Sequence, residues 1–388
     1  DPDTPGSGAV SWAMWITGLP GSGKSALARA VAASLRALGG AVSVLELDEI
    51  RKVLTPSPTY SDAERDAVYR ALVLVAAGLT EQGVPVIVDA TAHRRAWRDL
   101  ARARIPRFAE VQISCPLELC REREARRTGG HAPPGIYARA GQPGATVPGA
   151  DVPYEPARSP EIVVRSDVED RAAAAMRVVA LARALGPAAP PRPEPAGPGW
   201  ALWITGRPGS GKTTLARAVR DSLAARGLSA RVITAQEVCE EVLPAALAPA
   251  AALDIIHRTL VCAAKVLTEA GVCVIVDAGA PRRAWRDLAR RLIPNFAEVQ
   301  LLCPVDTCVE RERAARWDLR FARPARAEPP AAARAAELVL DYQESLQPDL
   351  TLHTHVQGLW TTVEEVLLLI RRLVARPAVS ISHAERRM

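Results

Sequence analysis

One eight-residue glycine-rich segment occurs twice in this chain and constrains its fold more than any other feature. Residues 18–25 read Gly-Leu-Pro-Gly-Ser-Gly-Lys-Ser, and residues 206–213 read Gly-Arg-Pro-Gly-Ser-Gly-Lys-Thr. Each copy follows a short apolar run and precedes a helical pattern, which is the strand–loop–helix order of a Walker A loop. Glycines let backbone N–H groups approach phosphate oxygens, and the helix N-terminus adds a positive dipole end. Both segments are therefore predicted to bind nucleotide phosphates.

The loop chemistry assigns a role to each residue type. The lysine reaches the β- and γ-phosphates, and the final hydroxyl binds Mg²⁺, so ATP and Mg²⁺ are the expected cofactors. The expected ATP-binding residues of the first copy are Gly18, Gly21, Ser22, Gly23, Lys24 and Ser25. The expected nucleotide-binding residues of the second copy are Gly206, Gly209, Ser210, Gly211, Lys212 and Thr213.

The repeat extends well beyond the loops. Lys24 and Lys212 are 188 residues apart, and residues 94–102 recur unchanged at 282–290. A period of this length indicates a duplicated domain, because solenoid repeats are only ~20–50 residues long. The expected organisation is an N-terminal tail (1–10), a first domain (11–185), a Pro- and Ala-rich semi-rigid linker (186–199), a second domain (200–376) and a C-terminal tail (377–388).

Each copy alternates short Val/Ile-rich strands with helical patterns. This alternation predicts an α/β fold, with two P-loop kinase-like domains that each have a parallel sheet flanked by helices. The strand candidates of the first copy are residues 13–17, 42–46, 84–89, 109–114 and 161–164.

Composition narrows the class of protein. Apolar residues make up 48% of the chain, yet no apolar run approaches the ~20 residues that cross a bilayer. No signal peptide is visible, although the chain starts at Asp1, and the seven cysteines lack disulfide or zinc spacing, which favours the cytoplasm. The net charge of +6 is compatible with a nucleic-acid partner. Because the basic residues are mixed with acidic ones and lack an aromatic platform, no nucleic-acid partner is expected.

Ligands of parallel sheets bind beyond the carboxyl ends of the strands. Asp89 ends the third predicted strand, where a carboxylate can hold Mg²⁺ through water, so Ser25 and Asp89 are the expected metal residues. The alternative for Asp89 is a cap on the following turn. His93 is a weaker candidate, and a solvated loop histidine is its alternative.

Four further segments of the first copy resemble the adenylylsulfate kinase family. Residues 45–51 read Leu-Glu-Leu-Asp-Glu-Ile-Arg where that family has Leu-Asp-Gly-Asp-Asn-Val-Arg. Residues 60–65 read Tyr-Ser-Asp-Ala-Glu-Arg where it has Phe-Ser-x-x-Asp-Arg. Residues 135–137, Gly-Ile-Tyr, match the segment that leads into its lid, and residues 148–155 resemble its Thr-Gly-Ile-Asp-x-Pro-Tyr-Glu.

The resemblance implies phosphoryl transfer from ATP to the 3′-hydroxyl of adenosine 5′-phosphosulfate (APS), giving 3′-phosphoadenosine 5′-phosphosulfate. Such a transfer needs mainly positioning and positive charge, which Lys24 supplies. Glu46 and Asp48 are the carboxylates expected to orient the acceptor hydroxyl or take its proton. The implied acceptor-binding residues are Arg51, Tyr60, Arg65 and Tyr137. Arg121 and Arg123 are expected to close over the ATP phosphates, with a solvated helix face as the alternative.

Several departures leave the acceptor open. Glu46 is one methylene longer than the family aspartate, Val68 replaces an asparagine, and Val147 replaces one of two aromatics that stack on the adenine. Residues 90–93 also differ from the family's Phe-Ile-Ser-Pro. The acceptor is therefore APS or another hydroxyl compound, such as a nucleotide, sugar or antibiotic. A nucleic-acid end kinase and a non-catalytic ATP-binding regulator are further alternatives.

The second copy keeps its loop and loses the acceptor side. Thr234, Gln236 and Cys239 stand where the first copy has Glu46, Asp48 and Arg51, and residues 323–338 replace the lid segment 135–149. We expect a degenerate domain that binds ATP without transferring phosphate. Regulation is one expected role, and pairing with the first domain in a dimer-like arrangement is another; a homodimer is also compatible.

Overall fold

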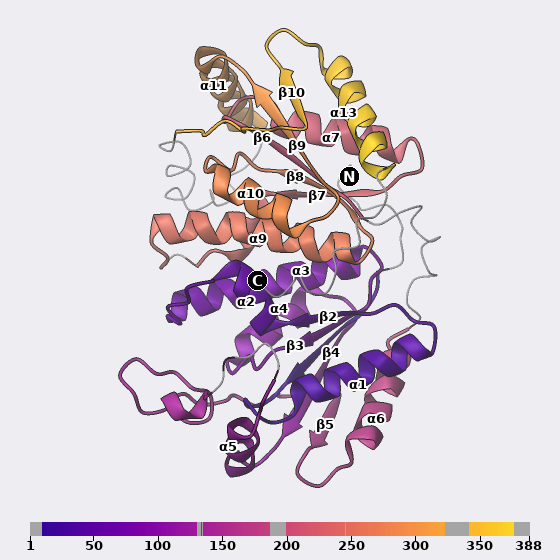
Figure 1. The fold of residues 1–388 in the computed structure, drawn as a ribbon, viewed down its shortest axis with the longest axis vertical. Helices are drawn as coiled ribbons and strands as arrows, with labels where there is room; N and C mark the ends of the chain where they lie inside the picture. The colour runs from indigo at the N-terminus through magenta and orange to yellow at the C-terminus, as the bar shows by residue number, and fades with distance from the viewer. Residues whose placement is uncertain are drawn as a thin grey trace. The chain divides into compact units, whose positions relative to one another are not determined.

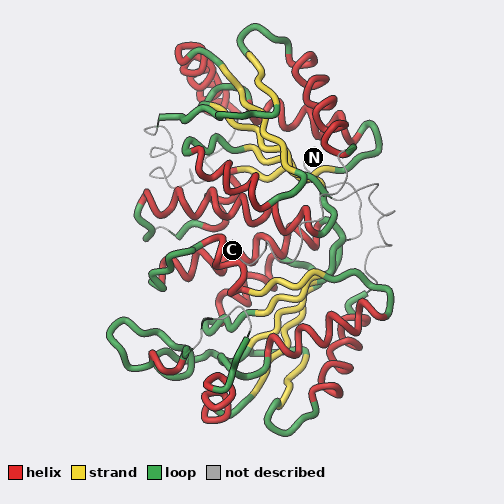
Figure 2. Tube along the Cα trace, viewed as in Figure 1, coloured by secondary structure: helices red, strands yellow, loops and turns green. Residues whose placement is uncertain are grey.

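The chain forms two compact units, Asp1–Arg192 and Pro193–Met388. The computed structural model describes residues 10–129, 133, 135–186, 199–244, 246–322 and 341–375. In each unit one layer of strands lies between two layers of helices (Figures 1 and 2), so the predicted α/β fold class is confirmed. Apart from residues 10, 186 and 199, the predicted tails and linker lie outside the described residues, and their boundaries stay predictions.

The sheet of the first unit is entirely parallel, with strand order β2-β3-β1-β4-β5. Its strands begin and end within one or two residues of the predicted positions. They are β1 (Ala13–Thr17), β2 (Ser43–Glu46), β3 (Val86–Asp89), β4 (Phe108–Ser114) and β5 (Ile162–Arg165). The helices are α1 (Lys24–Ala37), α2 (Leu47–Leu54), α3 (Asp62–Glu81), α4 (Arg95–Arg104), α5 (Leu117–Ala125), the 3₁₀ turn η1 (Tyr137–Arg139) and α6 (Arg171–Ala184).

Strand β1 is buried on both faces, as expected for a central strand of a covered parallel sheet. Met14 and Ile16 join a core with the apolar stripes of α1 and α6. Trp15 points to the opposite face and stacks on Tyr69 of α3, with 6.4 Å between ring centroids. The loop that follows β1 is thus anchored between two packed layers.

A buried arginine ties the helical layer to the sheet. Arg98 of α4 is fully buried and forms an ion pair with Glu110 of β4, with 2.6 Å between Nε and Oε1. Its two terminal nitrogens donate to the carbonyls of Ala92 and Glu155. Because each of the three guanidinium nitrogens lies against an oxygen inside the protein, Arg98 fixes the position of the segments that follow β3 and precede β5.

The second unit repeats this architecture with strand order β10-β9-β6-β8-β7. Arg286 and Glu298 form the equivalent buried ion pair at 2.7 Å. The strands are β6 (Ala201–Gly206), β7 (Ala230–Thr234), β8 (Cys273–Asp277), β9 (Phe296–Leu302) and β10 (Leu350–His353). The helices are α7 (Lys212–Ala224), α8 (Ala235–Val242), α9 (Pro249–Glu269), α10 (Arg283–Leu292), α11 (Val305–Ala322) and α13 (Leu359–Val374).

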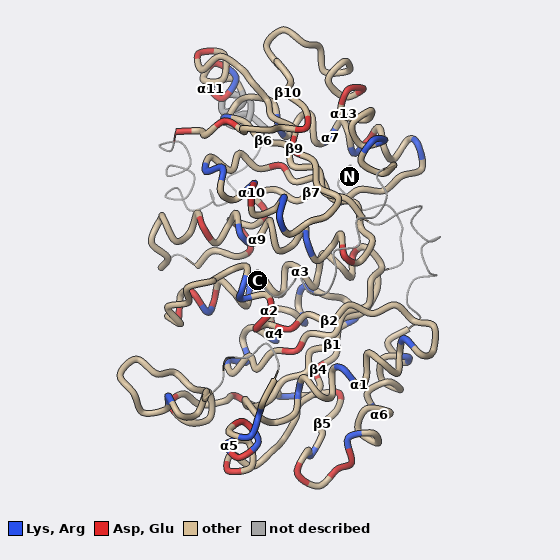
Figure 3. The backbone as a smooth tube through the Cα atoms, in the orientation of Figure 1, with Lys and Arg blue, Asp and Glu red and all other residues tan. Residues whose placement is uncertain are grey.

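Charged residues of both signs are interspersed along the helices of both units (Figure 3). Many of them pair locally, as Arg70 does with Asp66 and Arg258 with Asp254. Among the described helices, none combines the length and the apolar character that crossing a membrane requires.

Candidate functional site

The first glycine-rich loop connects β1 to α1 and depends on glycine geometry. Gly21 and Gly23 have φ angles of +78° and +102°, in the left-handed region that side chains disfavour. A Cβ atom at Gly21 would lie 2.2 Å from the carbonyl oxygen of Cys120 on α5. The loop therefore packs directly on the backbone of α5, and only a glycine fits at this contact.

Comparing Gly21→Ala with Gly39→Ala distinguishes the effect of the contact with α5 from the effect of backbone strain. Gly39 has nearly the same φ, +81°, but a Cβ there meets no atom within 4 Å. We expect Gly39→Ala to lower the free energy of unfolding by about 1–2 kcal/mol, the strain of a left-handed residue. Gly21→Ala should lower it further and weaken ATP binding, because the loop must move away from Cys120. Thermal melts with and without ATP measure both effects; equal losses in the two variants would contradict the contact.

Charged side chains gather where the loop meets the carboxyl ends of the strands. Lys24 donates from Nζ to the carbonyl of Leu19 at 2.9 Å. Burial lowers the pKa of Lys24, and the carboxylates of Asp89 and Asp48 oppose that shift. Burial raises the pKa of Asp89, while Lys24 and a hydrogen bond from Ser25 hold it down. One ammonium group thus faces two carboxylates at the mouth of the loop.

The hydroxyl–carboxylate pair beside each loop has the chemistry of a Mg²⁺ site. Ser25 bonds to Asp89, and in the second unit Thr213 donates from Oγ1 to Asp277 Oδ2 at 2.6 Å. Within the described ranges, no group of three His, Cys, Asp or Glu side chains could hold a metal ion. A divalent ion here would therefore need phosphate and water oxygens in addition, which suits Mg²⁺.

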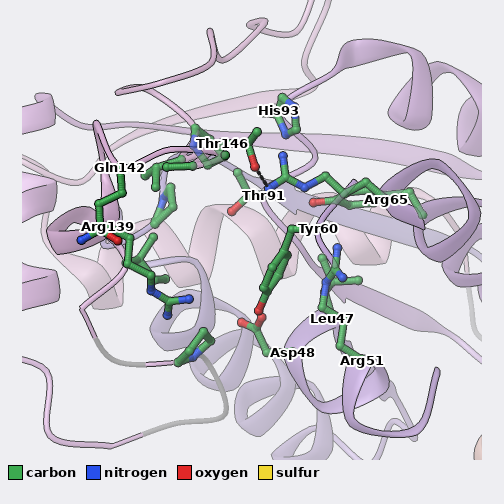
Figure 4. A pocket seen from close by; sticks show the side chains of 18 of the residues that line it. Leu47, Asp48, Arg51, Tyr60, Arg65, Thr91, His93, Arg139, Gln142 and Thr146 are labelled. Atoms are coloured by element: carbon green, nitrogen blue, oxygen red, sulfur yellow. Dashed lines mark hydrogen bonds between the residues drawn. The ribbon is translucent and has the colours of Figure 1, made fainter. Parts of the chain in front are cut away.

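A cavity of 310 Å³ is lined by three of the four expected acceptor-binding residues, Arg51, Tyr60 and Arg65, and by Asp48 (Figure 4). Asp48 and Arg51 reach it from α2, Arg65 reaches it from α3, and Tyr60 from the turn between these helices. The other lining residues come from α2 and α3, from the segments after β3 and around η1, and from the loop itself. They are Pro20, Leu47, Tyr69, Thr91, His93, Pro133, Ile136, Arg139, Gln142, Pro143, Gly144, Ala145, Thr146, Val147 and Pro148.

Two arginines flank the Tyr60 ring in this cavity. The guanidinium carbons of Arg51 and Arg65 lie 5.4 Å and 5.9 Å from its centroid. Arg65 is 9% exposed, and one terminal nitrogen (Nη1) of each arginine is buried without a hydrogen-bond partner among the described residues. Buried donors of this kind call for an acceptor, and an anionic group is the acceptor that guanidinium binds best.

Glu64 holds Tyr60 in place. Tyr60 has a φ of +54°, a conformation that a non-glycine residue adopts only with support. The carboxylate of Glu64 accepts hydrogen bonds from the backbone N–H groups of Thr59 and Tyr60, at 2.8 Å and 3.1 Å. It also lies 3.8 Å from Arg51, so the same residue positions the ring and one of the arginines. Sequence reasoning missed this role, although Ser61 and Glu64 have the spacing of a helix-capping box.

The structure separates four expected site residues from the cavity lining. Glu46 ends β2 and forms an ion pair with Arg29 at 3.8 Å. Tyr137 donates its hydroxyl to the carbonyl of Pro20, and Arg121 lies over the Tyr137 ring at 5.8 Å. Arg123 donates to Ser166, the residue after β5.

The cavity is also lined by residues that the sequence indicated weakly or not at all as site residues. His93 is 5% exposed, and burial together with the charges of Arg65 and Arg94 lowers its pKa to about 4, so the ring is neutral near pH 7. Thr146 accepts a hydrogen bond from Arg65. Thr91 and His93 could be found from the sequence because they follow a predicted strand. Arg139, Gln142 and Thr146 have no such feature beyond their place in the lid-like segment.

The second unit keeps the phosphate loop without the acceptor residues. Lys212 donates from Nζ to the carbonyls of Gly206 and Arg207, at 3.1 Å and 3.0 Å. Thr234 caps α8 by accepting from the N–H of Glu237, and Cys239, in the place of Arg51, is buried. The predicted replacement of the lid at 323–338 lies outside the described residues.

Comparison with known proteins agrees with this geometry. A family model described as adenylylsulphate kinase matches residues 10–165 and 198–318. The probable adenylyl-sulfate kinase of Archaeoglobus fulgidus is 38% identical over 165 residues, which are 42% of this chain and 100% of that protein. The adenylyl-sulfate kinase of Rippkaea orientalis is 39% identical over 158 residues, 40% of this chain and 82% of its own.

A solved structure of the APS kinase CysC from Mycobacterium tuberculosis, in complex with AMPPNP and APS, is also similar. It is 30% identical, with 45% of this chain and 98% of that chain covered and a TM-score of 0.40. The two stretches matched by the family model make up more than half of this sequence. The chain therefore belongs to the adenylylsulfate kinase family, as an ATP-dependent kinase that carries the family's domain twice.

Proposed function

We propose that the first unit transfers the γ-phosphoryl group of ATP to the 3′-hydroxyl of adenosine 5′-phosphosulfate. The observation that carries this proposal is the cavity beside the phosphate loop, where the Asp48 carboxylate and the Tyr60 ring lie with Arg51 and Arg65, each of which has a buried nitrogen without a hydrogen bond to a described residue. An acceptor with a hydroxyl, a flat ring and an anionic group matches this set of side chains. The similar kinases from other organisms support the same acceptor.

On the donor side, residues of the loop bind the phosphates. Backbone N–H groups between Gly18 and Ser25 surround the phosphate oxygens, and Lys24 compensates the charge that develops on the transferred group. Ser25 and Asp89 would hold Mg²⁺, which supplies further positive charge to the phosphates. Arg121 is placed near the loop by its contact with Tyr137, and we propose that it faces the nucleotide.

On the acceptor side, Asp48 is the carboxylate proposed to orient the hydroxyl and accept its proton. We prefer it to Glu46 because Asp48 lines the cavity and interacts with Lys24, whereas Glu46 is paired with Arg29. Arg51 and Arg65 would hold the anionic group of the acceptor through paired hydrogen bonds. Tyr60 would stack on the base.

Another small hydroxyl compound is the alternative acceptor. Val147 lines the cavity where the family has a second aromatic, so a base would be stacked on one face. Losing one stacking partner weakens binding by about 1–3 kcal/mol where this has been measured for bases on aromatic side chains. Val68, in the place of a family asparagine, is fully buried and has no side-chain donor.

An acceptor screen tests the proposal. ADP formation is measured with APS, then with nucleosides, nucleotides, sugars and aminoglycosides at equal concentration. We expect APS to give the largest ATP consumption above the rate without acceptor, together with a 3′-phosphorylated product. A faster reaction with another compound would replace APS as the acceptor. ATP binding with no acceptor-dependent ADP formation would favour a non-catalytic regulator.

Removing either arginine should weaken acceptor binding selectively. Arg51→Ala and Arg65→Ala each delete hydrogen bonds to an anion that contribute about 1.5–3 kcal/mol, so the KM for the acceptor should rise roughly tenfold to a hundredfold. The KM for ATP should change little. Arg177→Ala is the control, because Arg177 is half-exposed and pairs with Glu169 outside the cavity. A rise in the KM for ATP alone would show that these arginines bind the donor, and that our assignment of them to the acceptor is wrong.

For the second unit, we propose nucleotide binding without transfer. Its loop, Lys212 and the Thr213–Asp277 pair repeat the donor side of the first unit. At the acceptor side, Gln236 cannot act as a base, and the buried thiol of Cys239 offers no clamp for an anion. Bound ATP would then stabilise this unit by mass action.

A further inference from the structure

A chain of hydrogen bonds supports the first phosphate loop from the side of β5, beside α5 in Figure 1. Ser166, which follows β5, donates from Oγ to the carbonyl oxygen of Ser22 in the loop, at 2.8 Å. Arg123 of α5 donates from Nη1 to Ser166 Oγ at 3.2 Å and from Nη2 to the Ser166 carbonyl at 2.8 Å. A serine hydroxyl has one proton, and because Arg123 occupies a lone pair, that proton is directed at Ser22.

This bond fixes the orientation of one loop peptide. In a trans peptide the C=O of one residue and the N–H of the next point to opposite sides. With its carbonyl held by Ser166, the Ser22–Gly23 peptide turns the Gly23 N–H to the other side of the loop. Gly23 has a φ of +102° and carries no side chain, so this peptide can rotate at little steric cost unless a hydrogen bond holds it. The hydrogen bond that Ser166 donates to the Ser22 carbonyl supplies that restraint.

The charge of Arg123 strengthens the chain. A hydroxyl that accepts from a cationic donor is polarised and becomes a better donor itself. Arg123 is partly buried against Cys115, with 3.7 Å between Nη1 and Sγ. Both terminal nitrogens of the guanidinium thus donate to Ser166. The series of donors runs from Arg123 to the Ser166 hydroxyl and ends at the Ser22 carbonyl of the loop.

The second unit builds the same series with a different hydroxyl residue. Thr354, which follows β10, donates from Oγ1 to the carbonyl of Ser210 at 2.8 Å. Arg311 donates from Nη1 to Thr354 Oγ1 at 3.2 Å and from Nη2 to its carbonyl at 2.9 Å. Serine in one unit and threonine in the other share the hydroxyl and differ by a methyl group. The hydroxyl is therefore the element on which the arrangement depends.

We propose that Ser166 and Arg123 are positioning residues for phosphoryl transfer, which hold the Ser22–Gly23 peptide so that the Gly23 N–H faces the nucleotide phosphates. The inference rests on the proposed function of the first unit. In this proposal Arg123 acts on the loop through its hydrogen bonds to Ser166. The sequence had led us to expect a direct contact between Arg123 and ATP.

Ser166→Ala and Ser166→Thr in the full chain provide the first test. Ser166→Ala should raise the KM for ATP about tenfold, the effect of one lost hydrogen bond to the loop, and leave the KM for the acceptor unchanged. Ser166→Thr, which copies the residue of the second unit, should stay within about twofold of the wild type. A role in folding alone would lower the melting temperature and would not separate the two KM values. Equal KM values for ATP in Ser166→Ala and the wild type would overturn the proposal.

A double-mutant cycle tests whether Arg123 acts through Ser166. Arg123→Ala should raise the KM for ATP by a similar factor, and adding it to Ser166→Ala should change the KM little, because both variants break the same series. Additive effects would show that Arg123 contacts ATP independently, which contradicts the proposal.

Direct ATP titration separates failure of this inference from failure of the proposed function. The affinity is measured by calorimetry in full chains that carry Lys212→Ala, so that the second loop does not obscure the first. We expect ATP binding to the chain with Ser166 and about tenfold weaker binding with Ser166→Ala. Equal affinities would overturn the positioning role alone. No ATP binding by either chain would overturn the proposed function, and this inference with it.

Discussion

Lys24→Ala is expected to abolish phosphoryl transfer, with kcat reduced on the order of a thousandfold or more. Lys24 is the ammonium group at the mouth of the first loop, where it faces Asp89 and Asp48. Loss of one preorganised donor to a developing negative charge costs on the order of 10²–10³ in rate, and loss of a full positive charge costs at least as much. Steady-state ADP formation with the best acceptor measures the effect.

Lys212→Ala is the matched control, because it makes the same change in the second loop. It should retain measurable transfer, since the second unit has Gln236 and Cys239 where the first has Asp48 and Arg51. Loss of ATP-dependent stabilisation in a thermal melt is the expected effect of Lys212→Ala. Full turnover in Lys24→Ala, or none in Lys212→Ala, would contradict the assignment of the chemistry to the first unit.

Asp48→Asn should reduce kcat by about 10²–10⁴, the range for a general acid or base, while ATP still binds. The amide keeps the shape of the carboxylate and cannot take the proton of the acceptor hydroxyl. Glu49→Gln is the matched control, because it removes one negative charge from the same turn of α2 at an exposed position. Rapid-quench turnover and ATP titration separate the two steps. Equal losses in both variants would point to a general charge effect on the helix.

The sequence predicted the sheets and loops well because their signals are local. Val- and Ile-rich runs mark strands such as β3, which is buried on both faces, and the glycines of the loop mark left-handed backbone wherever the motif occurs. Glu46 and Asp48 were both expected as carboxylates for the acceptor hydroxyl, and the structure gives them different surroundings. Helix α2 begins at Leu47, directly after β2, so Asp48 lies in the first turn of a helix and reaches the cavity while Glu46 does not.

Contacts over long sequence separations could not be predicted in this way. Ser166 is distant in sequence from both Arg123 and Ser22, and only the order of the strands brings the three together. The support of Tyr60 by Glu64 was within reach, since the capping spacing was visible. The lid-side residues Thr146 and Arg139 carry no pattern that distinguishes them from solvated loop residues.

The buried arginine–glutamate pairs have a consequence for how such a chain diverges after duplication. Arg98 with Glu110, and Arg286 with Glu298, connect helix and sheet, and neither Arg98 nor Glu110 lines the acceptor cavity of the first unit. Mutations at the acceptor side can then accumulate in one copy without weakening its scaffold, and selection against unfolding does not remove them. Thr234, Gln236 and Cys239 are the kind of changes that this freedom permits. Duplication thus leaves one copy under selection for catalysis and the other open to acquire a different acceptor or to lose one.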